Sequence, residues 1–486
     1  MKYPPTVLTL VDGVRIVVPD SLDLITPFVL REQQDFFEDE LPFVRGLLEP
    51  GQNVIDIGAN YGVYTLPMAQ KVGSSGHVWA FEPAASTAQF LAQSIAANGF
   101  GNVTLEQKAV SSASGSARLC LHVHSELRSI SHGGSAAEGG ETVPLVTLDD
   151  RMDCHRWLDI DLIKIDAEGE ERNIVRGGGR FFANLEPLVQ YELRTNATDM
   201  NFDLIRDFAT MGYDSYRLSP GLNLLVPFDV ESPPDPYLLN LFSCKTARAD
   251  RLAARGALLR PRDLADADGS EGANGIRNGA DAKYHWRHAL AHMAYAVPLA
   301  PVWGMAEEAG ESADVHRALS FYARSRDDTL SMADRFHALE ASFLRLRTLC
   351  ERDPSHLRLG SLARVAHDYG ARAVSVKALT QLVESIRRIG VVDPNEPFLA
   401  PLERFESIAP GEALGDWILG AALEQLERRE YFSTFYVGPS ARERLEAIDA
   451  LGFGGPDMRR RLELVRLRIE RARAAKAQPA IAPDEL

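Results

Sequence analysis

The sequence predicts an α/β domain with a mostly parallel sheet, followed by an all-α domain. The chain of 486 residues is longer than one hydrophobic core usually supports, so at least two domains are expected. From about residue 50 to residue 242, short β-branched runs alternate with helical patterns, which is typical of strand–helix–strand units. After Cys244 the strand patterns stop, and apolar residues recur at helical spacing instead.

In the first half, five strands are expected to form the main sheet, at Asn53–Ile57, His77–Phe81, Val103–Gln107, Asp161–Ile165 and Leu188–Leu193. Several of these runs are mostly apolar, as strands covered by helices on both faces require. Two further strands, near Ser116–His122 and Thr142–Val146, flank a loop rich in glycine and serine. We therefore predict a lead-in over residues 1–49 and an α/β domain over residues 50–243.

The second half is predicted to begin with a linker over residues 244–283, because Arg260–Lys283 is rich in Gly, Asp and Ala without an apolar period. Few contacts are expected to cross it. A helical domain over residues 284–486 follows, with about seven to nine helices. Within it, Leu362–Ser385 has the spacing of a tetratricopeptide-like helical pair, and an irregular helical bundle is an equal alternative. The basic amphipathic helix at Arg459–Lys476 is expected to dock through its apolar stripe.

The charge and the cysteines restrict the compartment and the partners. The net charge of -16 disfavours nucleic acid, anionic membranes and acidic polymers as partners. Four scattered cysteines form no disulfide framework and no metal-ligand spacing. The N-terminus lacks the pattern of a signal peptide, and no run approaches the roughly 20 apolar residues of a membrane span. A cytoplasmic protein without a transmembrane segment is therefore expected.

The segment VIDIGANYGVYT, Val54–Thr65, indicates a cofactor site. A strand ending in Asp56 leads through a glycine-rich turn into a helix, where Gly58 and Gly62 are expected to admit a ligand close to the backbone. Asn60 tolerates the backbone angles of such a turn. The spacing is not the G-x-G-x-x-G of nicotinamide and flavin enzymes. Glu82 ends the second strand, where a carboxylate can accept hydrogen bonds from two ribose hydroxyls.

These residues and several later motifs resemble the FkbM family of S-adenosylmethionine-dependent methyltransferases. The resemblance covers about residues 10–242 and rests on VDGVRIVVP, QDFFEDE, VIDIGANYGVYT, FEP at Phe81–Pro83, KAVS at Lys108–Ser111, VTLDD, LIKIDAEGEERNIVRGG and YEL at Tyr191–Leu193. It implies a Rossmann-like class I methyltransferase domain and O-methylation of a hydroxyl.

The resemblance also implies where the donor would bind. S-adenosyl-L-methionine would lie over Gly58–Gly62, against Asp56 and Ala59, with its ribose on Glu82. Its adenine would lie beside the loop that contains Ala109 and Val110.

The candidate catalytic residues follow two later strands. Asp166 and Glu168 come after the fourth strand, Glu192 ends the fifth, and Lys164 shares a strand face with Asp166. In one interpretation, Asp166 or Glu168 is the general base that removes the hydroxyl proton. In another, Asp166 and Glu192 bind a divalent metal such as Mg²⁺ that holds the acceptor. A structural alternative is that Glu168 and Glu170 stabilise the N-terminus of the next helix.

Several histidines are weaker candidates. His285, His288 and His292 are expected on one helix face, but no cysteine or carboxylate in the pattern completes a metal site. His122 and His124 alternate on a strand near the expected active-site edge, where a role as base is conceivable.

The leading hypothesis is an O-methyltransferase that acts on a sugar, a glycan or a secondary metabolite. Its helical domain would recognise the substrate or a protein partner. The alternative is an interaction protein in which a helical scaffold carries a weakly active methyltransferase domain. Methylation of a protein nitrogen is disfavoured, because IDAEGE stands where an N-P-P-Y-type motif would be expected.

Overall fold

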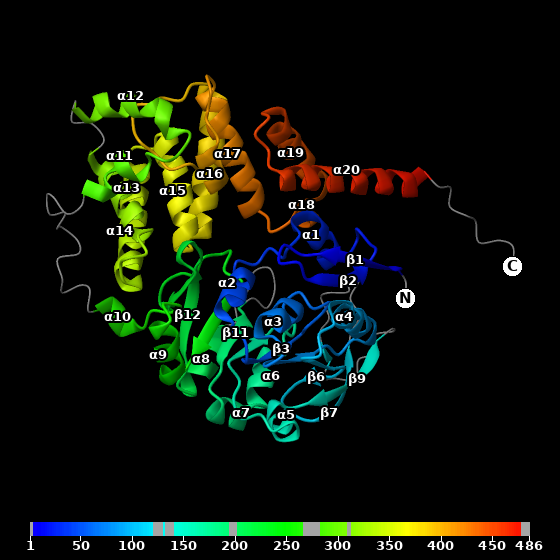
Figure 1. Ribbon diagram of the computed structural model, residues 1–486. Coiled ribbons are helices and arrows are strands. Elements are labelled where there is room, and N and C mark those ends of the chain that lie inside the picture. The colour runs from blue at the N-terminus through cyan, green and yellow to red at the C-terminus, as the bar shows by residue number, and fades with distance from the viewer. Residues whose placement is uncertain are drawn as a thin grey trace.

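In the computed structural model, the described residues are 3–119, 130–131, 140–193, 202–265, 282–308 and 313–477. Figure 1 shows an α/β body, coloured blue to green, with the helices of the second half stacked along one side of it. The strands are β1 Pro5–Thr9, β2 Arg15–Pro19, β3 Asn53–Ile57, β4 His77–Phe81, β5 Val103–Glu106, β6 Ala109–Val110, β7 Gly115–Leu119, β8 Ile130–Ser131, β9 Glu141–Val146, β10 Leu162–Ile165, β11 Leu188–Glu192, β12 Asp214–Ser219, β13 Leu224–Pro227 and β14 Asn240–Cys244.

The helices of the α/β part are α1 Ile25–Gln33, α2 Glu40–Leu47, α3 Thr65–Val72, α4 Ala85–Asn98, α5 Leu148–His155, α6 Glu171–Arg176, α7 Gly179–Asn184, α8 Phe202–Thr210, η1 Pro220–Leu222, α9 Thr246–Ala254 and α10 Pro261–Ala265. Those of the second part are η2 Ala282–Tyr284, α11 Trp286–Ala289, α12 Ala296–Glu308, α13 Ala313–Ser325, α14 Met332–Arg352, α15 His356–Tyr369, α16 Arg372–Ile389, η3 Glu403–Ser407, α17 Leu414–Arg429, α18 Thr434–Val437, η4 Gly438–Ser440, α19 Ala441–Ala450 and α20 Pro456–Ala477.

The main sheet has eight strands in the order β13-β12-β14-β11-β10-β3-β4-β5. The five predicted strands, β3, β4, β5, β10 and β11, run parallel, whereas β14 pairs with β11 in antiparallel orientation. A smaller sheet, β6-β9-β7-β8, contains both of the extra strands that the sequence indicates. The predicted Rossmann-like α/β fold with an all-α part after it is therefore confirmed.

Alternation along β3 builds a hydrophobic core on each face of the sheet. Val54 packs on one side, with side chains from α2, α3 and α4. Ile55 packs on the other side, with side chains from α5, α6, α7 and α8. Both faces are covered, which explains why Val54 and Ile55, on opposite faces of this strand, are both apolar.

The predicted linker over residues 244–283 is wrong in its first part. Residues 246–254 form α9, whose Leu252 belongs to the core on the Val54 face. Arg248 is buried and its Nη1 lies 3.0 Å from Asp161 Oδ1, just before β10. The Gly-, Asp- and Ala-rich composition describes only the stretch from Arg260 on, and the amphipathic helix α9 lies before it. Residues 266–281 lie outside the described part of the chain.

The two parts of the chain share a core, contrary to the expectation of few contacts. Leu222, Leu224 and Val226 extend from η1 and β13 into the hydrophobic cluster formed by the helices of the second part. Ser219 Oγ donates to the carbonyl of Asp368 at 3.0 Å. The antiparallel edge of the sheet therefore serves as the docking surface for α15.

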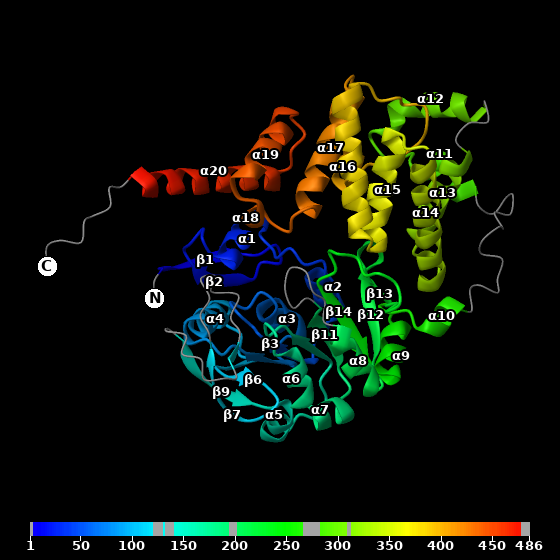
Figure 2. The same cartoon turned by 180° about the vertical axis from the view of Figure 1, so that it is seen from behind.

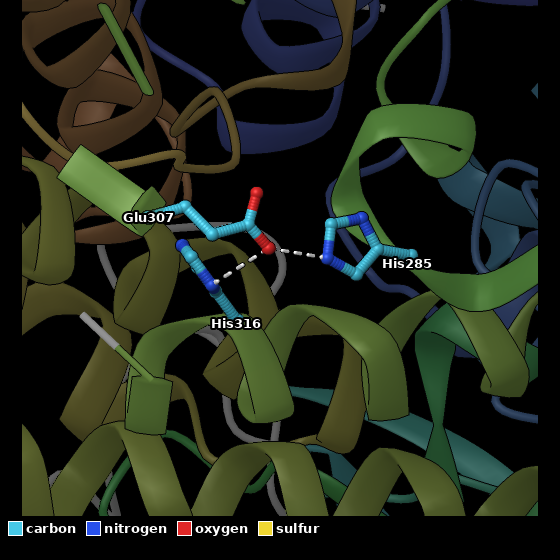
Figure 3. Close-up of side chains that lie close together, drawn as sticks. All are labelled: His285, Glu307 and His316. Atoms are coloured by element: carbon cyan, nitrogen blue, oxygen red, sulfur yellow. Dashed lines mark hydrogen bonds and ion pairs between the residues drawn. The ribbon is translucent and has the colours of Figure 1, made fainter. Parts of the chain in front are cut away.

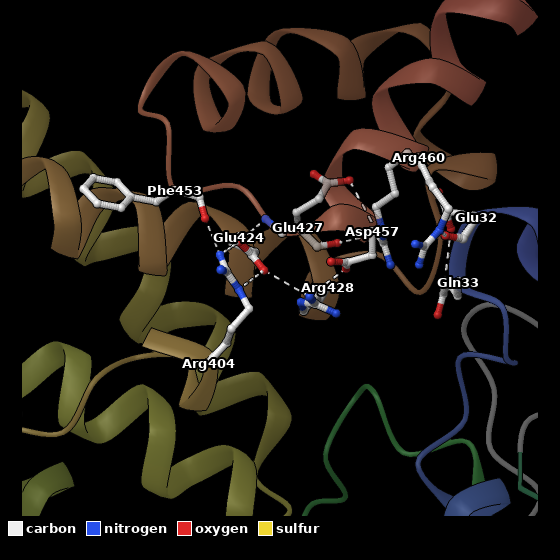
Figure 4. A network of polar contacts seen from close by, with 11 residues as sticks. Glu32, Gln33, Arg404, Glu424, Glu427, Arg428, Phe453, Asp457 and Arg460 are labelled. Atoms are coloured by element: carbon white, nitrogen blue, oxygen red, sulfur yellow. Dashed lines mark hydrogen bonds and ion pairs between the residues drawn. The ribbon is translucent and has the colours of Figure 1, made fainter. Parts of the chain in front are cut away.

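The N-terminal lead-in is a second point of attachment. Thr434 N donates to Glu32 Oε1 at 3.0 Å, Gln33 Nε2 donates to the carbonyl of Phe432 at 2.8 Å, and Arg460 Nε donates to the carbonyl of Glu32 at 3.3 Å. Figure 4 shows how this contact joins α1 to a polar network between α17 and α20. The helical part thus contacts the α/β part at two places, at α1 and at the segment from β12 to β13 (Figure 2).

Several predictions for the second half can be compared with the structure directly. The helical pair expected at Leu362–Ser385 is observed as α15 and α16, which pack against each other. The helix expected at Arg459–Lys476 is α20, which docks through Leu462 and Val465 as predicted. From residue 282 on, the described residues form ten α-helices, and α11 and α18 have only four residues each. None of the described helices combines the length and the apolar composition needed to cross a membrane.

Candidate functional site

A pocket opens at the carboxyl edge of the sheet, where β3 lies between β4 and β10. The chain runs from β3 to β4 and β5 on one side and returns to β10 on the other, and such a switch in strand order is where α/β sheets bind ligands. The pocket has a volume of about 980 Å³, counting the part open to solvent. It is lined by Thr26, Phe36, Glu38, Asp56, Ile57, Gly58, Ala59, Asn60, Val63, Tyr64, Phe81, Glu82, Pro83, Thr87, Lys108, Ala109, Val110, Leu119, Lys164, Asp166, Ala167 and Glu168.

The glycine-rich turn forms the floor of this pocket. Gly58 and Ala59 both donate backbone N–H bonds to the carbonyl of Phe81 at 3.0 Å, which ties the turn to the end of β4. Gly58, Asn60 and Gly62 have φ values of 80°, 49° and 97°, so the expectation that Asn60 takes an unusual backbone angle is correct.

The structure shows a further reason for the two glycines, besides the expected approach of a ligand. A Cβ atom on Gly58 would lie 1.8 Å from the carbonyl oxygen of Asp166, and one on Gly62 would lie 2.5 Å from Cδ1 of Leu91. The glycines are therefore required by contacts within the protein, between the turn and its neighbours β10 and α4. The sequence alone could not show this, because it does not reveal which segment lies behind the turn.

We expect Gly58→Ala to lower the free energy of unfolding by about 3 kcal/mol, since it adds a backbone clash to a left-handed conformation. Gly212→Ala is the matched control, because Gly212 has a φ of 79° with nothing within 4 Å of the added Cβ. The control should cost only about 1 kcal/mol. Urea unfolding of both variants measures the difference, and equal costs would show that the contact with Asp166 imposes no constraint.

Glu82 links the turn to the end of β4. Its side chain is buried, with Oε2 accepting from Asn60 N at 3.0 Å and Oε1 accepting from Ala84 N at 2.9 Å. A carboxylate can accept several hydrogen bonds, so a side chain of this kind on the pocket wall is suited to ligand hydroxyls. The structure thus places Glu82 on the pocket wall in a fixed orientation.

Asp56 is buried beneath the turn. Its Oδ2 accepts from Thr65 Oγ1 at 2.5 Å, whereas its Oδ1 has no hydrogen-bond partner among the described residues. Burial raises the pKa of Asp56, and nearby Lys164 opposes this effect. A buried carboxylate oxygen without a donor is costly, so a cationic group of a ligand would be stabilised here.

The opposite side of the pocket is apolar. Ala109 and Val110 form β6, are buried and line the pocket, and Leu119 from β7 lies beside them. This wall suits a flat, weakly polar group such as a purine ring.

Lys164 and Asp166 lie together at the end of β10. Lys164 Nζ is 2.8 Å from Asp166 Oδ2 and 4.8 Å from the centroid of the Tyr64 ring. Burial alone would lower the pKa of Lys164, but Asp166, Asp56 and Glu38 together raise it above its ordinary value. Lys164 is therefore a buried cation surrounded by carboxylates.

A hydrogen-bond network that the sequence did not reveal completes this side of the pocket. Tyr64 Oη donates to Glu38 Oε2 at 2.6 Å, and Asn240 Nδ2 donates to the same oxygen at 3.1 Å. Gln190 Nε2 donates to Tyr64 Oη at 3.0 Å. Glu38 lies in QDFFEDE and Tyr64 in VIDIGANYGVYT, so the motifs that contain both were visible in the sequence although their contact was not.

The loop after β10 differs from the expected helix cap. Glu171 Oε1 accepts from the backbone N–H groups of Ala167 and Gly169, at 3.1 and 3.0 Å. Glu170 instead accepts from Ser111 Oγ at 2.9 Å. Glu168 has a φ of 48° and lines the pocket. Glu170 thus stands at the N-cap position of α6 but makes no side-chain capping hydrogen bond, and Glu171 binds N–H groups of the loop before the helix.

Glu192 ends β11 opposite Asn240 and is not among the residues that line the pocket. Burial raises its pKa to about 10, assisted by the negative charges of Asp166, Glu168, Glu171 and Glu38. Among the described residues, Asp166 and Glu192 belong to no group of three metal-ligating side chains. Their role as a metal pair stays a prediction without support from the structure, and His122 and His124 lie outside the described residues.

A glycine-rich turn, an acid at the end of the next strand and a pocket at the switch point are features by which Rossmann-like domains bind nucleotide-containing cofactors. Residues 56–215 match the sequence family described as the methyltransferase FkbM domain, so this chain contains an FkbM methyltransferase domain. A search of curated proteins finds no significant match to the chain.

Solved structures similar to this chain include three methyltransferases. The methyltransferase FkbM from Methylobacillus flagellatus is 18% identical, with 42% of this chain and 47% of that one covered and a TM-score of 0.30. An rRNA methylase from Streptococcus thermophilus is 12% identical, with coverage of 42% and 93% and a TM-score of 0.25. An S-adenosylmethionine-dependent O-methyltransferase from Thermotoga maritima is 14% identical, with coverage of 50% and 78% and a TM-score of 0.25. The chain thus spans about half the length of the first of these structures, and the assignment rests on the family match.

Proposed function

We propose that this protein is an S-adenosylmethionine-dependent O-methyltransferase that methylates a hydroxyl of a sugar, a glycan or a secondary metabolite. The observation that carries the proposal is the arrangement of the pocket. Groups suited to the donor lie on the glycine-rich turn and β6, and carboxylates suited to a hydroxyl acceptor lie at the end of β10.

The donor fits the groups on the glycine-rich turn, at the end of β4 and on β6. Asp56 Oδ1, which has no partner among the described residues, would accept from the ammonium of the donor. Glu82 would accept from the ribose hydroxyls, and Ala109 and Val110 would contact the adenine. When bound, S-adenosylmethionine would supply an electrophilic methyl carbon, which the acceptor oxygen would attack in line, with the thioether of S-adenosylhomocysteine as the leaving group.

The acceptor side is rich in carboxylates. Glu38, Asp166 and Glu168 line the pocket, and carboxylates accept hydrogen bonds from hydroxyl groups. They would repel a phosphate or another anionic acceptor, which favours a neutral polyhydroxyl compound. Asp166, oriented by Lys164, is our first candidate for the base that takes the hydroxyl proton, and Glu168 is the second.

Incubating the full chain with donor labelled on its methyl group and a panel of acceptors tests the proposed activity. We expect labelled product with sugars or hydroxylated small molecules and none with protein or RNA. Label transferred to nitrogen would contradict O-methylation. Donor binding without transfer to any acceptor would instead support the alternative of a scaffold with a weakly active domain.

A pH-dependent stability is expected from Glu192. Its pKa lies at about 10 in the folded chain against an ordinary value of 4.5, so the folded state retains a proton that the unfolded state loses in this window. The protonated Glu192 side chain therefore contributes its full stability below pH 4.5, and this contribution is lost as the pH rises toward 10. Glu192→Gln cannot lose a proton, so it should be more stable than the wild type at pH 8 and similar at pH 4.

Urea unfolding at several pH values measures this effect. Glu231→Gln, at an exposed position, is the control and should keep the slope of the wild type. If Glu192→Gln also keeps that slope, Glu192 is ionised in the folded protein and the crowding of carboxylates around it has been overestimated.

A further inference from the structure

Three side chains with metal-ligating atoms meet in the helical part of the chain, outside the donor pocket. His285 is the N-cap residue of α11, Glu307 lies in the last turn of α12, and His316 lies in the first turn of α13. Figure 3 shows both imidazole rings directed at the carboxylate of Glu307. Within the described ranges, this is the one group of at least three His, Cys, Asp or Glu residues whose ligand atoms all lie within 4.8 Å of one another.

The sequence indicated only one of these ligands. His285, His288 and His292 were expected on one helix face, but α11 covers only Trp286–Ala289, and His288 and His292 are exposed. The missing carboxylate and the second histidine come from the following two helices, which no local spacing could reveal.

The distances suit a small metal ion. His285 Nε2 lies 2.7 Å from Glu307 Oε1, and His316 Nδ1 lies 3.7 Å from the same oxygen. Zinc bonds of about 2.0–2.1 Å place the ligand atoms of a tetrahedral site about 3.3 Å apart. The two separations lie on either side of that value, so small side-chain adjustments would bring the three atoms around one ion.

The surroundings fix the carboxylate without covering it. Arg287 donates to Glu307 Oε2 from Nη2 at 3.0 Å and from Nε at 3.2 Å, which leaves Oε1 directed at the histidines. Hydrogen bonds from a neighbouring side chain to a ligand residue orient the ligands of metal sites in this way. The exposed fractions of the His285, Glu307 and His316 side chains are 34%, 28% and 12%, so an ion could reach the group from solvent.

We propose that His285, Glu307 and His316 bind one divalent transition-metal ion, with Zn²⁺ the preferred ion. Two imidazole nitrogens and one carboxylate oxygen favour Zn²⁺ over Mg²⁺ and Ca²⁺, which prefer sites built from oxygen alone. Because the ligands come from α11, α12 and α13, the ion cross-links three successive helices, with its fourth position left to water. This site is independent of the proposed methyl transfer.

The experiment uses the full chain without an affinity tag, stripped of metal with a chelator that is then removed by dialysis. Calorimetric titration with Zn²⁺ should show one site per chain with micromolar or tighter affinity, and Mg²⁺ should show none. We expect at least about 100-fold weaker Zn²⁺ binding in each of His285→Asn, Glu307→Gln and His316→Asn. Even loss of a residue that only hydrogen-bonds to a metal ligand typically costs about 10- to 100-fold in affinity. His288→Asn and His292→Asn are the matched controls and should change the affinity less than about twofold.

The wild-type titration decides the proposal even if a variant fails to fold. Absence of a one-to-one Zn²⁺ site in the wild type would overturn it and leave the group as a hydrogen-bonded ion pair. The proposal would also fail if the two control variants lost as much affinity as the three ligand variants. Circular dichroism of each variant shows whether its helices are intact.

Discussion

Replacing Glu82 with alanine is expected to weaken binding of S-adenosylmethionine at least about 100-fold. Bonds from Asn60 N and Ala84 N orient the carboxylate on the pocket wall, and a carboxylate in this position is suited to accept from two ribose hydroxyls. Two hydrogen bonds to a charged group, each contributing about 1.5 kcal/mol, sum to about 3 kcal/mol, which corresponds to roughly 100-fold in affinity. Release of the glycine-rich turn would add to this loss. Isothermal titration of the variant with the donor measures the change.

The control for this variant is Glu106→Gln. Glu106 ends the neighbouring strand β5 and binds Lys108, Arg151 and His155, but it does not line the pocket. Donor affinity should stay within about twofold of the wild type. If Glu82→Ala binds the donor as tightly as Glu106→Gln does, the ribose is held elsewhere, and the role proposed for Glu82 is wrong.

Asp166→Asn is expected to lower the turnover number at least about 100-fold while donor affinity changes little. A general base contributes about 10² to 10⁴ in rate, and an asparagine cannot take the proton. Its amide oxygen can still accept from Lys164 Nζ, so the geometry of the buried pair is preserved. The loss should therefore fall on kcat, measured with an acceptor identified from the panel.

Two further variants make this result specific. Glu170→Gln changes a buried carboxylate in the same loop that binds Ser111 and does not line the pocket, so turnover should stay near that of the wild type. Glu168→Gln tests the second candidate base. If only Glu168→Gln loses activity, the roles are exchanged. Full activity in both the Asp166 and Glu168 variants would mean that the base lies outside β10 and its loop.

The core of the α/β part could be predicted because strand ends carry their own signal. The mostly apolar runs located the five parallel strands to within one residue at each end. The acids near the end of a strand or just after it indicated Asp56, Glu82 and Asp166 as pocket residues. In a parallel sheet, these ends meet at one edge whatever the connecting segments do. The position of the pocket at this edge could therefore be predicted from the sequence.

Contacts between distant segments could not be predicted in this way. Glu38 reaches Tyr64 and Asn240 only because the lead-in lies across the end of the sheet, and no local pattern encodes that path. The same holds for Leu224 in β13, which belongs to the core of the helical part. Composition suggested a boundary after Cys244, whereas burial shows a sheet edge and a helical stack that share one hydrophobic core.

Binding of S-adenosylmethionine in the pocket at the end of β3 is tested most directly by a titration with its unreactive product. S-adenosylhomocysteine added to the full wild-type chain should bind at one site with micromolar affinity, and NAD should show no binding in the same range. No binding of S-adenosylhomocysteine at millimolar concentrations, or equal binding of NAD, would contradict the account.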